Sequence, residues 1–208
     1  PLRITDSQLH QIFFHVNTLR FSLWQKRDLS GRLLEIRSGR SSDNALEVEK
    51  GPTWGFPHAM LYETGPAMRF YQRMPIEQQA REMLNNPPSY IVAYPSNITR
   101  LAQYFAENGL DLPELQQIST YGETVLPETA SICSDTWGLV PADMYSSEEV
   151  GYIALQCPQG EGYHCMSESI LVEVLDESGN ACQPGEIGRV VLTVLHNFAW
   201  PLIRYENL

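Results

Sequence analysis

The stretch "LQQISTYGETVLPETASICSDTWGLVPADMY", residues 115–145, decides the fold class. Its two ends, "LQQISTYGE" and "LVPADMY", are typical of strands that run into polar loops. The segment "LPETASICSDTW" between them is typical of a helix. A strand, a helix and a second strand at this spacing predict a parallel sheet whose strands are joined by crossover helices.

The residues before this stretch continue the alternation. A long amphipathic helix is predicted in "TDSQLHQIFFHVNTLRFSLWQKRD", with Thr5 as its N-cap and Gln8 three residues later. Ser38 to Tyr71 is predicted to hold most of the loops, and "EKGPTWGFPHAMLYETGP" within it is too rich in glycine and proline for one regular element. Further elements are predicted as strands in "GRLLEIRS" and "SYIVAYP", and as helices in "PIEQQAREMLNN" and in "SNITRLAQYFAENG", which has Ser96 as its cap.

The pattern changes from Gly151 onward. The segments "YIALQC", "SILVEVLD" and "GRVVLTVL" are predicted strands, joined by the turns "ESGN" and "QPGEIG". We therefore predict an α/β fold, a parallel sheet with crossover helices followed by a mostly antiparallel β subdomain. The predicted domains are 1–150, incomplete on its N-terminal side, and 151–208.

Composition excludes several classes of partner. The chain has 208 residues, of which 43% are hydrophobic, so a sizeable core can form. A net charge of -11 argues against a nucleic acid or an anionic membrane as the main partner. No apolar run reaches the roughly 18 residues of a membrane span, and four cysteines without dense spacing indicate a reducing compartment. We expect a cytoplasmic protein.

Two polar loops follow neighbouring strands of the predicted sheet. In such sheets ligands bind beyond the carboxyl ends of the strands, where "STYGE" and "DMYSSEE" both fall. Gly122 would let the backbone approach a flat ligand, Tyr145 offers a ring for stacking, and Glu149 is a carboxylate able to hold Mg²⁺ beside phosphates. The alternative is that both loops are ordinary solvated turns.

The order and spacing of five segments resemble those of the adenylate-forming acyl-CoA ligase superfamily, and within it the phenylacetate-CoA ligase-like branch. The loop at Asp143 to Gly151 resembles that superfamily's D-x-Y-G-x-T-E-x-G loop. The resemblance covers nearly the whole chain, and the last two segments are its most specific part. The five segments are "TYGE", "DMYSSEEVG", "GYHCMSES", "VEVLDESGNACQPGEIGRVVLT" and "FAWPLIRYENL".

The resemblance implies an activity. In this superfamily a small-molecule carboxylate attacks the α-phosphate of ATP with Mg²⁺, and a thiol, that of coenzyme A or of a carrier, then displaces AMP from the acyl-adenylate. Residues 1–150 would be the nucleotide- and acyl-binding core. At the matching positions, Gly122 and Glu123 would contact adenine, and Asp143 and Met144 would line its edge. Tyr145 would stack on the adenine ring, and Ser146 and Glu148 would lie beside the nucleotide. The catalytic Glu149 would bind Mg²⁺.

Two positions depart from the superfamily's pattern. Ser146 stands where a glycine is expected, and Glu148 stands where a hydroxyl residue would donate to the α-phosphate. Glu148 is expected to weaken ATP binding unless it turns into solvent or shares Mg²⁺ with Glu149. The phosphate loop, the ribose-binding aspartate and the catalytic lysine of the superfamily lie outside this chain, so the fragment alone is expected to be inactive. The alternative function is a degenerate relative that binds a ligand or a protein without catalysis.

The segment "CPQGEGYHC" could instead hold a metal site. Cys157 and His164 could bind zinc together with Cys165 or Cys182, although adjacent His164 and Cys165 point to opposite faces of a strand. The alternative is that these cysteines are small buried hydrophobic residues. His58 follows "GFP" and would either line an acyl pocket or pack among aromatic residues.

Overall fold

The computed structural model describes residues 5–39, 47–160 and 162–206. Two predicted segments lie partly outside the described residues. They are the loop range Ser38 to Tyr71, at residues 40–46, and "FAWPLIRYENL", at Asn207 and Leu208. Contacts group the chain into two compact units. One unit is Lys26–Met144, and the other combines the N-terminal helix with the chain from Tyr145 onward.

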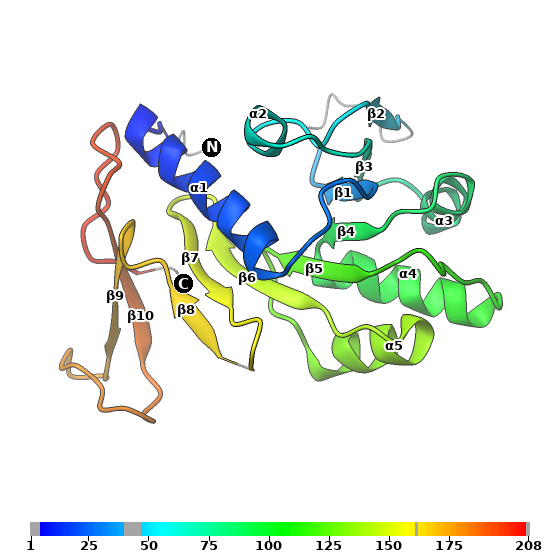
Figure 1. Ribbon diagram of the computed structural model, residues 1–208. Coiled ribbons are helices and arrows are strands. Elements are labelled where there is room, and N and C mark those ends of the chain that lie inside the picture. Colours follow the sequence, from blue (N-terminus) through cyan, green and yellow to red (C-terminus); the bar gives the residue numbers. More distant parts are fainter. Residues whose placement is uncertain (1–4, 40–46, 161, 207–208) are drawn as a thin grey trace. The chain divides into compact units, whose positions relative to one another are not determined.

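The unit Lys26–Met144 is a sheet covered by helices (Figure 1). Its strands pair in the order β2-β3-β1-β4-β5-β6, and all neighbours are parallel except β2, which is antiparallel to β3. This confirms the predicted parallel sheet with crossover helices. The elements are β1 (Leu33–Arg37), β2 (Glu49–Gly51), α2 (His58–Leu61), β3 (Ala67–Tyr71), α3 (Ile76–Asn85), β4 (Tyr90–Ala93), α4 (Pro95–Glu107), β5 (Gln117–Tyr121), α5 (Pro127–Trp137) and β6 (Ala142–Ser147), whose last three residues belong to the other unit.

The core of this unit lies between the sheet and helices α3, α4 and α5. Alternate residues of β1, Leu34 and Ile36, are fully buried there together with Ile118 of β5 and Phe105 of α4. This alternation is the two-residue period of a strand. A second, smaller apolar cluster surrounds Trp54 and includes Leu33 of β1 and Tyr90 of β4.

The second unit is rich in β-structure. Strand β7 pairs with β8 antiparallel, and a separate antiparallel sheet has the order β11-β10-β9. The predicted antiparallel β subdomain is confirmed. The elements are α1 (Gln8–Trp24), β7 (Gly151–Gln156), β8 (Tyr163–Cys165), β9 (Ile170–Leu175), β10 (Arg189–Val194) and β11 (Tyr205–Glu206).

Helix α1 contacts the β-rich part of its unit. Thr18 Oγ1 and the Tyr152 hydroxyl are 3.2 Å apart, and the ring centroids of Phe14 and Tyr152 are 4.9 Å apart. Asn17 Nδ2 donates to Ser169 Oγ at 3.3 Å. These contacts explain why α1 groups with the chain from Tyr145 onward. The division into domains 1–150 and 151–208 stays a prediction. It assigns α1 to domain 1–150.

Several predicted helix and strand ends were wrong. The N-cap of α1 is Ser7, whose Oγ accepts from the His10 N–H at 3.2 Å, and not Thr5. Helix α4 begins at Pro95, because proline at the first helical position needs no hydrogen-bond partner, so Ser96 lies inside the helix. Strands β2 and β3 lie within the segment predicted as loops, and β6 extends into the loop as far as Ser147.

No helix among the described residues is long and apolar enough to cross a membrane.

Candidate functional site

Two predicted site residues, Asp143 and Met144, lie on β6 beside residues of β5. The parallel register places Thr120 opposite Asp143 and Tyr121 opposite Met144. The Thr120 hydroxyl donates to Asp143 Oδ1 at 2.7 Å, which orients that carboxylate. Met144 is buried, with 6% of its surface exposed. The predicted adjacency of these two strand ends is therefore confirmed.

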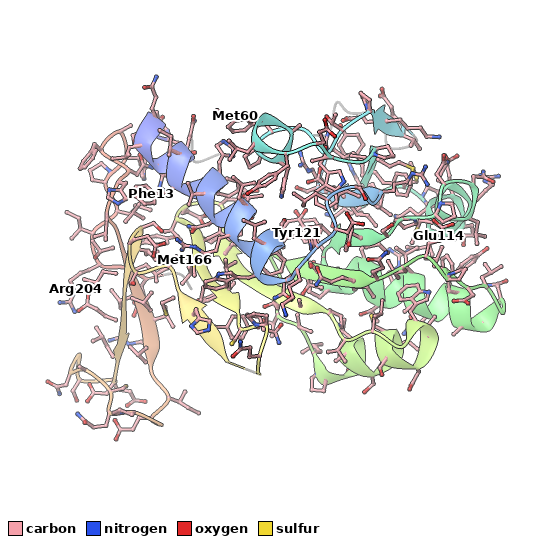
Figure 2. The ribbon with its side chains drawn as sticks, in the orientation of Figure 1. Phe13, Met60, Glu114, Tyr121, Met166 and Arg204 are labelled. Carbon is pink, nitrogen blue, oxygen red and sulfur yellow. The ribbon has the colours of Figure 1, made fainter. Side chains whose placement is uncertain are left out.

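Gly122 is required by its conformation and by its surroundings. Its φ is 75°, in the left-handed region that favours glycine, and a Cβ there would lie 2.9 Å from Cε1 of Tyr94. The Tyr94 ring packs against Tyr121, with ring centroids 4.6 Å apart. The Tyr121 hydroxyl donates to the Ile36 carbonyl at 3.0 Å. Tyr121 is labelled in Figure 2. Burial raises the pKa of Tyr121, so its hydroxyl stays protonated. The backbone at Gly122 therefore lies against the packed rings of Tyr94 and Tyr121.

Glu123 contacts the start of helix α4. Its two carboxylate oxygens accept from the Ser96 backbone N–H and the Ser96 hydroxyl, each at 2.9 Å. A carboxylate at this position satisfies a backbone donor of the first helical turn and is attracted by the helix dipole. Sequence reasoning missed this role, because it took Ser96 itself to be the cap of the helix.

Replacing Glu123 with alanine is expected to destabilise the unit Lys26–Met144 by about 1 kcal/mol, the usual value of a lost helix cap. Urea unfolding followed by circular dichroism measures the change. Glu128→Ala is the matched control, because Glu128 lies in the first turn of α5 without a hydrogen-bond partner among the described residues. Equal losses in the two variants would contradict a specific role for the contact with Ser96.

The remaining predicted site residues belong to the other unit and lie on the hairpin from β6 to β7. Tyr145 is 39% exposed, Ser146 is half-buried at the end of β6, and Glu148 and Glu149 lie in the turn that follows. Glu148 is exposed, which agrees with the alternative that it turns into solvent. Glu149 is half-buried and has no hydrogen-bond or ion-pair partner among the described residues.

The end of this hairpin is fixed against α1. Gly151 has a φ of 74°, and a Cβ there would come within 3.5 Å of Phe14 and 3.6 Å of the His10 ring. The hydroxyl of Ser147 is buried and has no partner within the described part of the chain. The burial of this hydroxyl could not be predicted from the sequence pattern.

The predicted zinc site receives no support. Among residues 5–39, 47–160 and 162–206, no three histidine, cysteine or acidic side chains lie close enough to hold a metal ion. His164 packs edge-on against Trp24, with ring centroids 5.3 Å apart, and Cys157 continues the β7–β8 hairpin through a 2.7 Å hydrogen bond to the Gly162 carbonyl. Cys182 lies instead against Gly188, beside β9.

His58 is a buried residue of the apolar cluster on the second face of the sheet. It is 6% exposed and packs edge-on against Trp54, with ring centroids 5.2 Å apart. Burial, helped by the nearby Arg27 charge, lowers its pKa from 6.5 to about 4. Arg27 itself donates to Gln117 Oε1 at 2.7 Å and to Ser119 Oγ at 2.5 Å. At neutral pH His58 is therefore a neutral, packed side chain.

The fold is similar to that of solved CoA ligases, although no family model and no curated protein matches the chain. One is 2-hydroxyisobutyryl-CoA ligase in an open conformation with 2-HIB-AMP and CoA, at TM-score 0.69 and 18% identity over 93% of this chain and 46% of that one. Another is a benzoate CoA ligase from Burkholderia xenovorans LB400, at TM-score 0.60 and 12% identity over 88% and 37%. A third is a long-chain-fatty-acid-CoA ligase from Archaeoglobus fulgidus, at TM-score 0.60 and 12% identity over 92% and 39%.

The chain spans less than half the length of each of these structures. The similarity extends over about nine-tenths of this chain and includes both the parallel sheet and the antiparallel sheet. The sequence identities of 12–18% are low, so the similarity concerns the fold alone. The chain has a fold similar to that of part of each of these CoA ligases.

Proposed function

We propose that the chain is the central part of an ATP-dependent ligase that activates a carboxylate as its acyl-adenylate, an acid-thiol ligase of the AMP-forming, acyl- or aryl-CoA ligase-like type. The observation that carries this proposal is the fold shared with a ligase solved with 2-HIB-AMP and CoA. The glycine with a positive φ at the end of β5 and the oriented Asp143 at β6 support it. The phenylacetate-CoA ligase-like branch and a cytoplasmic location remain part of the proposal on sequence grounds.

The proposed roles follow the chemistry of each group. The backbone at Gly122 and Glu123 would face adenine, and the Glu123 carboxylate is bound by Ser96. Asp143 and Met144 would line the edge of the base, and Tyr145, which is 39% exposed, would supply its ring face. Ser146 and Glu148 would lie beside the nucleotide.

Magnesium fits the donor set. Mg²⁺ is commonly bound by one or two carboxylates together with substrate phosphates, and Glu149 is a half-buried carboxylate without a partner among the described residues. When bound, the metal would neutralise phosphate charge during attack by the substrate carboxylate. The acceptor in the second half-reaction would be the thiol of coenzyme A or of a carrier.

Replacing Glu149 with glutamine in the full-length protein is expected to lower carboxylate-dependent ATP–pyrophosphate exchange at least about 100-fold and to raise the Mg²⁺ concentration for half-maximal rate. The matched control is Glu148→Gln, the same change at the adjacent exposed position, which should alter the rate less than about threefold. Equal losses in both variants would mean that the two carboxylates share the metal. An unchanged Glu149→Gln rate would remove the metal role.

A second candidate function is a ligand-binding or interaction module without catalysis. Ser146 and Glu148, which replace a glycine and a hydroxyl residue in the superfamily's loop, favour it. Calorimetry with a non-hydrolysable acyl-adenylate analogue distinguishes the two candidates. Binding of the analogue without pyrophosphate exchange for any of a panel of aliphatic and aryl acids would identify the binding module.

A further inference from the structure

The side of Gly122 that lacks a Cβ faces the ring of Tyr94, the residue that directly follows β4. A Cβ at Gly122 would lie 2.9 Å from Cε1 and 3.4 Å from Cδ1 of this ring. The ring therefore occupies the space in which a side chain of residue 122 would lie. Tyr94 is half-buried and Gly122 is exposed, so the ring borders the backbone at which adenine binding is proposed.

Two features hold the Tyr94 ring in this position. The ring packs against Tyr121 with ring centroids 4.6 Å apart and an angle of 41° between the planes, and the Tyr121 hydroxyl is bound to the Ile36 carbonyl. Tyr94 is also the N-cap residue of α4, so its backbone is fixed by the first helical turn. The ring cannot swing away from Gly122 unless its packing against Tyr121 is lost.

The surface beside Tyr94 is apolar on the β4 side. Ala93 belongs to the core beneath the helices, and because adjacent residues of a strand point to opposite faces, Val92 lies on the other face. There Val92 is half-buried and packs against the apolar cluster around Trp54. Strand β6, on the other side of β5, carries the Asp143 carboxylate. An apolar group joined to a nucleotide at the end of β5 is therefore expected to lie on the side of Tyr94.

We propose that Tyr94 limits the size of the acyl group, so that the carboxylate substrate is a small aliphatic acid and not a long-chain or aryl acid. This inference rests on the proposed function, because it concerns the acid that is adenylated at the strand ends. The acyl group would contact the edge of the fixed Tyr94 ring. A long chain or an aromatic ring would need the volume that this ring fills.

Rates with acids of different size test the role of Tyr94. Carboxylate-dependent ATP–pyrophosphate exchange is measured with the full-length protein, and kcat/KM is determined for acetate, propionate, hexanoate and benzoate. The value for propionate is expected to exceed those for hexanoate and benzoate at least about 100-fold, because a fixed wall rejects larger groups by steric overlap. The ratio of two kcat/KM values from one preparation does not depend on the fraction of folded protein, so a loss of stability cannot produce this result.

Variants of Tyr94 and one control assign the effect to this ring. Tyr94→Ala should raise the ratio of kcat/KM for hexanoate to that for propionate at least about tenfold, and Tyr94→Leu, which keeps a smaller apolar side chain, should raise it less. Tyr94→Phe keeps the ring and should keep this ratio within about threefold of the parent value. Tyr104→Ala is the matched control, because Tyr104 is a tyrosine of the last turns of α4 that packs against the core. It should leave the ratio unchanged.

The proposal is overturned if propionate and hexanoate give equal kcat/KM values in the parent protein, or if hexanoate or benzoate is preferred. An unchanged ratio in both Tyr94→Ala and Tyr94→Leu, or the same shift in Tyr104→Ala, would also overturn it. Exchange with none of the acids would instead refute the adenylation on which the inference rests, so the two failures are distinguished.

Discussion

Lowering the pH from 7 to 4 is expected to remove about 3 kcal/mol of unfolding free energy through His58 alone. Its pKa is about 4 in the folded chain and 6.5 when exposed. Between these values the unfolded chain binds the proton and the folded chain does not, so stability is present above pH 6.5 and is lost as the pH falls toward 4. Each pKa unit corresponds to about 1.4 kcal/mol.

Urea unfolding at a series of pH values tests this expectation. His58→Gln should be less stable than the parent chain at pH 7, because packing against Trp54 is lost, but it should lose less stability on acidification. Trp54→Phe is the control, since it disturbs the same cluster and keeps the imidazole. It should lower stability at every pH while preserving the slope. Parallel curves for the parent chain and His58→Gln would refute the argument.

Gly122→Ala is expected to lower the unfolding free energy by about 3 kcal/mol. Part of the loss, about 1 kcal/mol, comes from placing a side chain at a φ of 75°. The rest arises because the new Cβ would lie 2.9 Å from Cε1 of Tyr94, so this ring would have to move out of its packing against Tyr121. The same displacement should abolish nucleotide binding if the proposed adenine contact at this backbone is correct.

Gly138 provides a matched control. It has a φ of 70°, and a Cβ there would meet no atom within 4 Å, so Gly138→Ala should cost only the conformational part, about 1 kcal/mol. The double variant Gly122→Ala with Tyr94→Ala should show a favourable coupling energy of about 1 kcal/mol or more, because the second change removes the clash. Equal losses at the two glycines would show that Tyr94 does not restrict Gly122.

Prediction from the sequence succeeded where a local pattern is repeated over many residues. The strands at "SYIVAYP" and "ISTY" and the helix at "PIEQQAREMLNN" were correct, because the spacing of buried residues decides them locally. It failed at β3, which lies at the end of the range predicted to hold loops. That strand is held mainly by its register with β1, Leu33 opposite Ala67, and such pairing between distant residues leaves no local signal.

The candidate site shows the same division. Residue types and their order were enough to predict that Gly122 and Asp143 lie at the ends of adjacent parallel strands, because parallel strands in an α/β sheet end at one edge. The hydrogen-bond partners of Glu123 and Asp143 could not be predicted from the sequence. Ser96 is 27 residues from Glu123 in the sequence, and Thr120 is 23 residues from Asp143.

By itself the sequence determined the class of fold, the parallel sheet followed by antiparallel strands, because periodicity and turn residues act over short distances. The tertiary structure alone decided what each polar side chain contacts. It places the Glu123 carboxylate on α4, buries the Asn97 amide, and desolvates His58. These outcomes depend on long-range packing, which sets burial and hydrogen bonding and therefore the charge and chemistry of each group.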